Sequence, residues 1–319
     1  MALAHLNNKK FQIGDIANLA HLNDGTLENH LKLFLLTCQV NNLSPRSISD
    51  YSQKIGAFLD FLEHQGFNRL EEINSTQIRL FLLDRQQRCK PASVKDYYGC
   101  IARFFNWLVE EEIIEESPMA RMRPPRVPKQ LIKPFKPQDI TDLLSLCDNT
   151  FLGLRNRAII LTFLDTGLRL SELANIQLED MDFDREIIKV MGKGAKERVV
   201  RMGKETQKAV LKYLLQRDDS LPCLWVTEER RPLHREGVQT MIIRLGRRAK
   251  ITGVRVSPHT FRHTFGTWSI KHGANIFEVQ SLLGHSTLAM TRKYAATIDS
   301  EDAVKHHKAF SPVDRLRPR

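Results

Sequence analysis

Residue types that can do chemistry recur around glycines in the second half of the chain. Arg169 comes shortly after a glycine, and Glu172 lies three residues further on, which is one helical turn. The carboxylate could therefore hold the guanidinium group in place. Lys193 is the first of two lysines in Gly192–Lys196, a stretch with the composition of a tight turn.

A second group of such residues surrounds the segment Ser257–His263. A proline at a helix start would place His259 and Arg262 one turn apart, near the N-terminus of that helix. This end of a helix has free N–H groups and a positive dipole, and both suit a phosphate. A glycine and a serine flank His285, as at a helix stop and a new N-cap, and Tyr294 lies nine residues beyond this histidine.

Each feature alone also has a simpler explanation as a surface arginine, a packed tyrosine or an ordinary turn. A metal site formed by His259, His263 and His285 is disfavoured, because no carboxylate lies between the first two histidines and Arg262 would stand beside the ion. The glycine-rich nucleotide motifs GxGxxG after a strand and GxxxxGK[ST] are both missing from the sequence. The order and combination of the features are far more specific than any one of them.

The elements that must position these residues are mostly helical. Two strands, Glu186–Met191 and Arg198–Met202, are expected to form a hairpin around the lysine-bearing turn. Seven helices are expected around it: Gln138–Cys147, Arg155–Thr166, Lys204–Gln216, Arg235–Lys250, Pro258–Lys271, Ile276–Leu283 and Thr287–Ala296.

The N-terminal part has the pattern of a small helical bundle. Apolar residues recur at helical spacing between Ser44, a candidate N-cap, and Gly66, a candidate stop. Three more stretches share that pattern: Leu27–Val40, Ser75–Arg88 and Ala92–Glu111. The fold class expected is therefore mainly α with a small antiparallel β-sheet in the C-terminal domain.

A basic, proline-rich segment separates the two parts. Residues 117–137 hold six of the thirteen prolines and six basic residues but no acidic ones, and proline disfavours regular structure. Residues 1–116 carry 12 basic and 15 acidic side chains (net −3), and residues 138–319 carry 30 and 22 (net +8). We therefore expect an unassigned extension (1–22), a helical domain (23–116), a linker (117–137) and a C-terminal domain (138–319) whose tail begins near residue 298.

Composition narrows the function classes. The net charge of +11 favours a polyanionic partner. Five scattered cysteines without a CxxC pair disfavour a disulfide framework or a zinc ribbon. The sequence has neither a long apolar run nor a signal-peptide pattern at its start, so we expect a cytoplasmic protein that is not in a membrane.

Taken together, the motifs closely resemble those of the tyrosine recombinase (phage integrase, Xer-like) family. The match runs through 166–172, 192–198, 257–265 and 282–294, and the helical N-terminal half is similar to the family's core-DNA-binding domain. The resemblance places the catalytic set on six residues, with Glu172 supporting the first of them: Arg169, Lys193, His259, Arg262, His285 and Tyr294. It implies a two-domain clamp around DNA.

The resemblance also implies a mechanism. Tyr294 would attack a DNA phosphodiester and form a 3′-phosphotyrosyl link, with Lys193 as the general acid and His259 as the candidate general base. Because the covalent link retains the bond energy, no ATP is required. The two arginines and His285 would do what metal ions do in many nucleases, so no metal or other cofactor is expected. The implied partners are double-stranded DNA with paired half-sites, at the nucleoid, and three further copies of the chain in a tetramer joined through the C-terminal tails.

Basic residues near helix starts, on polar faces and in the linker are candidates for DNA contact. They are Arg46, Arg79, Lys90, Lys95, Arg121, Arg123, Arg126, Lys129 and Lys133. Two other functions stay open: a type IB topoisomerase that relaxes DNA, and a catalytically silent DNA-binding relative. The target site, the accessory proteins and the biological role are not readable from the sequence.

Overall fold

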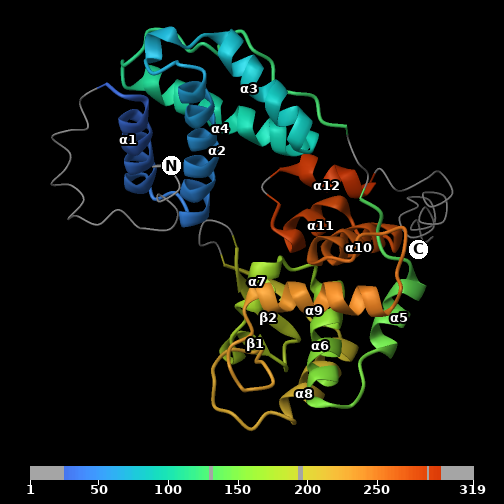
Figure 1. Cartoon of the computed structure of the whole chain (residues 1–319). Helices are drawn as coiled ribbons and strands as arrows, with labels where there is room; N and C mark the ends of the chain where they lie inside the picture. Colours follow the sequence, from blue (N-terminus) through green and yellow to red (C-terminus); the bar gives the residue numbers. More distant parts are fainter. Residues whose placement is uncertain (1–24, 129–131, 193–196, 286, 296–319) are drawn as a thin grey trace, which may run out of the picture. The chain divides into compact units, whose positions relative to one another are not determined.

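The computed structural model describes residues 25–128, 132–192, 197–285 and 287–295, and the chain divides into two compact units, 1–130 and 131–319 (Figure 1). The boundary between the units falls inside the basic, proline-rich segment. The ends of that segment belong to the units themselves, since Met119 is buried in the first core and Phe135 in the second. No helix of the described residues is long and apolar enough to cross a membrane.

Four α-helices and one 3₁₀ turn make up the described part of the first unit: α1 (Leu27–Val40), α2 (Pro45–His64), η3 (Leu70–Glu72), α3 (Ser75–Arg88) and α4 (Pro91–Glu110). Side-chain oxygens of Thr26, Ser44 and Asn74 cap α1, α2 and α3. Proline occupies the first position of α2 and α4, where a backbone N–H would have no helical partner.

Aromatic side chains fill the core of the first unit. Phe34 of α1 packs against Phe104 and Trp107 of α4, and Phe58 of α2 packs edge-on against Phe81 of α3 at 5.2 Å between ring centroids. Edge-to-face contacts of this kind add to the free energy gained by burying the rings. The four helices therefore share one core.

Eight α-helices, one 3₁₀ turn and three strands make up the described part of the second unit. The helical elements are α5 (Pro137–Ser145), α6 (Phe151–Thr166), α7 (Leu170–Ala174), η4 (Leu178–Asp180), α8 (Lys204–Leu214), α9 (Arg235–Arg248), α10 (Pro258–Lys271), α11 (Ile276–Leu283) and α12 (Leu288–Ala295). The strands are β1 (Met181–Asp182), β2 (Ile187–Met191) and β3 (Glu197–Arg201), in an antiparallel sheet of order β1-β2-β3.

Two buried clusters hold the second unit together. In the larger one, Phe261 of α10 lies against Phe163 of α6 and against Phe135, whose backbone N–H donates to the Thr264 hydroxyl of α10 at 2.9 Å. The smaller cluster joins α10, α11 and α12 through Ile270, Val279, Leu283 and Tyr294 (Figure 1).

The expected fold class, mainly α with a small antiparallel sheet, is confirmed. The short helix α7 and the two-residue strand β1 were not anticipated, because neither is long enough to show a period. Helix α6 begins one turn earlier than expected, since the Thr150 hydroxyl caps it by accepting from the N–H of Gly153.

Candidate active site

Arg169 is positioned by a sharp turn at the end of α6. Gly167 adopts φ +62°, and a Cβ there would lie 2.4 Å from the ring of Phe265, so only glycine fits. The chain then reverses, and Arg169 becomes the N-cap residue of α7. Its Nη1 donates to Glu172 Oε1 at 2.6 Å, and its backbone N–H donates to Oε2 of the same carboxylate at 2.7 Å.

Arg198 of β3 completes the environment of Glu172, and our sequence reasoning missed it. Its Nη1 and Nη2 donate to the two carboxylate oxygens, each at 2.9 Å. Burial opposes the ionisation of Glu172, but the bonds from Arg198 and Arg169 outweigh burial and lower its pKa to about 2. The alternation of side chains along β3 could have indicated that Arg198 points inward, because it shares its face of the strand with the buried Val200.

Arg262 of α10 lies deeper than Arg169. It is buried, and its Nη1 and Nη2 donate to the backbone oxygens of Gly167 (2.8 Å) and Leu283 (2.6 Å). Burial, together with repulsion from Arg169, lowers the pKa of its guanidinium to about 10, so Arg262 remains charged at neutral pH.

These arginines form a positively charged site. Three guanidinium groups (Arg169, Arg198 and Arg262) and one carboxylate (Glu172) leave a net charge of +2. The two bonds of Arg262 use two of the five N–H donors of a guanidinium. A site with spare donors and excess positive charge can bind a phosphate.

Tyr294 of α12 lies among histidines and glycine in the smaller core cluster. It is only 2 % exposed, and its ring centroid is 5.1 Å from that of His263 and 6.0 Å from that of His285, on which it stacks. A Cβ on Gly266 would lie 2.9 Å from the tyrosine ring, so this glycine makes room for it. Burial raises the pKa of Tyr294, and the nearby charges of Arg262 and Arg169 oppose that shift.

The two histidines of the predicted catalytic set, His259 and His285, differ in exposure. His285 is buried, and its Nδ1 forms a 2.8 Å hydrogen bond with the hydroxyl of Thr291, a contact that was not anticipated. It follows Gly284, whose φ of +61° ends α11 as expected. His259 lies in the first turn of α10 and is exposed, whereas Arg262 on the next turn is buried.

The structure thus brings Arg169, Glu172, Arg262, His285 and Tyr294 together, with Arg198 added. Lys193 and Lys129 lie outside the described residues. The other DNA-binding candidates are all exposed: Arg46, Arg79, Lys90, Lys95, Arg121, Arg123, Arg126 and Lys133. Nowhere in the described parts of the chain do three or more His, Cys, Asp or Glu side chains gather as they would around a metal ion.

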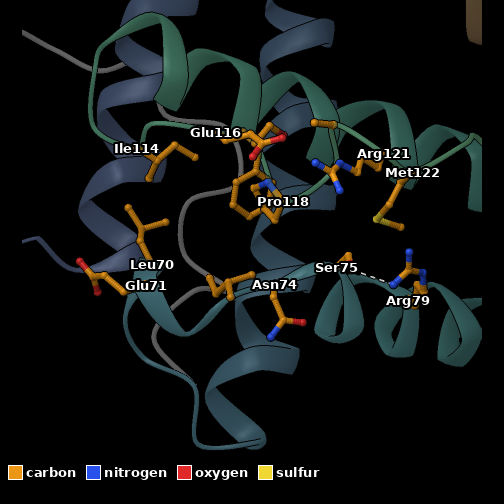
Figure 2. Close-up of a pocket in the computed structure, with 14 residues that line it drawn as sticks. Leu70, Glu71, Asn74, Ser75, Arg79, Ile114, Glu116, Pro118, Arg121 and Met122 are labelled. Carbon is orange, nitrogen blue, oxygen red and sulfur yellow. Dashed lines mark hydrogen bonds between the residues drawn. The ribbon is translucent and has the colours of Figure 1, made fainter.

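Two of those candidates line one hollow of about 470 Å³ in the first unit. Figure 2 shows Arg79 reaching it from α3, where it donates to the hydroxyl of Ser75, and Arg121 reaching it from the turn after α4. The carboxylates of Glu71 and Glu116 line the same hollow, so its charge is mixed.

Comparison with known proteins agrees with this geometry. Residues 133–301 match the model of the phage integrase family, and residues 20–115 match that of the phage integrase N-terminal SAM-like domain. The tyrosine recombinase XerC of Anoxybacillus flavithermus is 32 % identical over 275 residues, which is 83 % of this chain and 91 % of that protein. XerD of Pasteurella multocida is 30 % identical over 295 residues, covering 88 % and 97 % of the two chains.

The fold agrees as well. A solved structure of lambda integrase (residues 75–356), a dimer bound to a COC′ core site, superposes with a TM-score of 0.71 at 18 % identity, covering 83 % of this chain and 97 % of that one. The sequence match to the catalytic-domain model spans more than half of the chain and contains the arginine cluster and the buried tyrosine. The chain is therefore a member of the phage integrase family, a tyrosine recombinase of the XerC/XerD type.

Proposed function

We propose that this protein recombines DNA at specific sites by cutting and rejoining strands through a 3′-phosphotyrosyl intermediate. The observation that carries the proposal is the meeting of Arg169, Arg262, His285 and Tyr294 from four segments in one positively charged site. The duplex binds to both units, and the exposed basic residues of the first unit contribute contacts to its phosphates.

Tyr294 is the nucleophile. Its phenolic oxygen forms a bond to phosphorus, the bond from phosphorus to the 5′-oxygen breaks, and Lys193 gives that oxygen a proton. The phenolic proton passes to His259. A free 5′-hydroxyl of another strand then attacks the phosphotyrosine and releases Tyr294, so that the number of phosphodiester bonds is conserved.

Arg169, Arg262 and His285 stabilise the five-coordinate transition state. Charge grows on the non-bridging oxygens as the phenolate adds, and donors that are already in place act most strongly at that moment. The same guanidinium groups favour the phenolate of Tyr294, because Arg262 and Arg169 oppose the rise in its pKa that burial causes.

Covalent trapping on DNA tests this function. A random-sequence library first yields a duplex that the purified protein binds, and a nick placed next to the cleavage position lets the leaving fragment diffuse away. We expect the wild-type protein to become attached to the strand, and Tyr294→Phe to bind equally well without attachment. Attachment of that variant would contradict the nucleophile assignment, and no attachment of the wild type would indicate a silent DNA-binding relative.

The second alternative, a type IB topoisomerase, differs in its products. Such an enzyme relaxes supercoiled plasmid without exchanging strands between sites. We expect this protein instead to join the flanks of two labelled duplexes that each carry the selected site. Relaxation without such joined products would favour the topoisomerase.

We further propose that four copies of the chain act together on two DNA duplexes, each of which carries a pair of half-sites. They would do so at the nucleoid in the cytoplasm. Recombination needs four strand cuts, and head-to-tail contacts between protomers close into a ring. The tail beyond Tyr294 is proposed to bind the neighbouring protomer, in keeping with the family. Deleting residues 301–319 should leave binding to one site intact and weaken pairing of two sites, whereas recombination at the full-length rate would contradict this role.

A further inference from the structure

Three arginines hold three consecutive backbone carbonyls at the end of α11. Arg198 donates to Leu282 O at 3.1 Å, Arg262 to Leu283 O at 2.6 Å and Arg169 to Gly284 O at 2.9 Å. The last carbonyls of a helix have no partner within it and lie at the negative end of its dipole. The guanidinium groups thus satisfy the end of α11, immediately before His285.

Of these three arginines, Arg198 is the one to which the family resemblance assigns no catalytic role. Its Nε binds Leu282 O, while its two terminal nitrogens bind both oxygens of Glu172, and its side chain is 14 % exposed. A Cβ on Gly284 would lie 3.3 Å from Arg198 Cδ and Nε, so this glycine leaves room for the arginine.

We propose that Arg198 is a positioning residue of the strand-cleavage reaction, acting through Glu172 on Arg169 and through the Leu282 carbonyl on the segment that carries His285. The proposal rests on the function proposed above. Glu172 holds the Arg169 guanidinium through Oε1 at 2.6 Å, and Arg198 fixes the orientation of that carboxylate by binding both of its oxygens.

The position of Arg198 in the chain gives its hydrogen bonds to Glu172 and Leu282 O a second consequence. It is the second residue of β3, in the β2–β3 hairpin, and it follows Lys193 by five residues in the sequence. Anchoring β3 to Glu172 and to α11 therefore ties the hairpin to the arginines that we propose bind the phosphate. A lysine at this position would keep the charge but lose the planar fork, so it could not hold Glu172 and Leu282 O in the same way.

The test is a comparison of two substrates with the variant Arg198→Lys. The probe is the nicked duplex described above, with either a normal phosphodiester or a methylphosphonate at the cleavage position. In a methylphosphonate a methyl group replaces one non-bridging oxygen and the linkage is uncharged, so its cleavage depends much less on Arg169. Arg201→Lys is the matched control, because Arg201 lies on the same strand, is 77 % exposed and pairs with Glu186, away from the arginine cluster's carboxylate.

On the phosphodiester, we expect Arg198→Lys to cleave on the order of 10–100-fold more slowly than wild type, as is typical when a partner that orients a functional group is lost. On the methylphosphonate, the defect should shrink to a few-fold, and Arg169→Lys should show the same pattern. Arg201→Lys should match the wild type on both substrates.

Four outcomes would overturn the proposal. If Arg198→Lys cleaved the phosphodiester at the wild-type rate, Arg198 would have no role in cleavage. If its cleavage rate fell equally on both substrates, Arg198 would have only a structural role. If Arg198→Lys does not fold, Glu172→Gln replaces it, and an equal loss on both substrates by that variant also refutes the idea. If the wild type itself forms no Tyr294-linked product, the proposed function fails, and the positioning role fails with it.

Discussion

The two units of this protein bury very different side chains. Among the described residues, the first unit buries one polar side chain, Asn29, whereas the second buries twelve, among them Arg155, Glu172, Arg262 and His285. The interior of the first unit is made of aromatic and aliphatic groups, and its arginines lie on the surface or pair with nearby carboxylates.

This difference indicates where the chain gives up stability for chemistry. Burying a charged group costs free energy unless it is paired and hydrogen-bonded. The second unit buries charge at Glu172 and Arg262, and hydrogen bonds to carboxylate and carbonyl oxygens offset part of the unfavourable free energy. Groups held in this way are already oriented for the phosphate that we propose they bind, whereas an exposed arginine of the first unit is not.

The largest effect is expected from two buried arginines of the second unit that have different partners. Arg262→Lys should slow covalent trapping by on the order of 10²–10³, because one preset donor to the phosphate is lost. Arg155 is equally buried but binds Val226 O and the side chain of Asn156. Arg155→Lys should lower the melting temperature and leave the trapping rate per folded molecule unchanged, because burial alone does not mark function. A rate loss as large as that of Arg262→Lys would contradict the assignment of the Arg262 effect to a lost phosphate donor.

A sulfur substitution at the leaving oxygen sharpens the assignment of Lys193. We expect Lys193→Ala to slow cleavage of an ordinary phosphodiester by on the order of 10²-fold, a typical share for general acid catalysis. The defect should nearly vanish when sulfur replaces the 5′-oxygen, because a thiolate leaves without a proton. Equal defects on the two substrates, measured by single-turnover trapping, would move the role to Lys196.

Acid unfolding measures what the buried carboxylate contributes to the second unit. The pKa of Glu172 in the folded protein, about 2, lies below its ordinary value of 4.5, so the folded state binds fewer protons. Its ionisation therefore adds stability on the order of 3 kcal/mol above about pH 4.5, and this is lost as the pH falls toward 2. Wild type and Glu172→Gln should thus differ most in unfolding free energy near neutral pH and converge in acid; a constant difference would contradict the pairing.

The smallest effect is expected in the first unit. Arg79→Ala and Arg121→Ala should each weaken DNA binding a few-fold and reduce the slope of log affinity against log salt by about 1. Arg103→Ala is the matched control, since Arg103 is exposed but pairs with Glu110 at 3.1 Å. If neither Arg79→Ala nor Arg121→Ala alters the salt dependence of DNA affinity more than Arg103→Ala does, Arg79 and Arg121 do not contact DNA phosphates.

Local patterns were enough to predict most of the helices. Helices α1, α3, α10 and α11 have the predicted bounds, because apolar spacing and capping residues act within a few positions of one another. The turn at Gly284 was also predictable, since a left-handed helix end strongly favours glycine.

Long-range contacts could not be predicted in this way. Arg198 lies 26 residues from Glu172 and 84 from Leu282, and no local pattern connects them. Helix α7 and strand β1 are too short to show a period; in the structure α7 contacts α9 and β1 pairs with β2.

The sequence by itself determined the residue types, their order and the family, because motifs such as Ser257–His263 carry the chemistry in adjacent positions. Only the tertiary structure decided which of these groups meet and in what surroundings. It buried Tyr294 between His263 and His285, and it joined three arginines to the end of α11. The physical reason is that burial and hydrogen bonding set the charge state and orientation of a side chain, and both depend on segments that lie far apart in the chain.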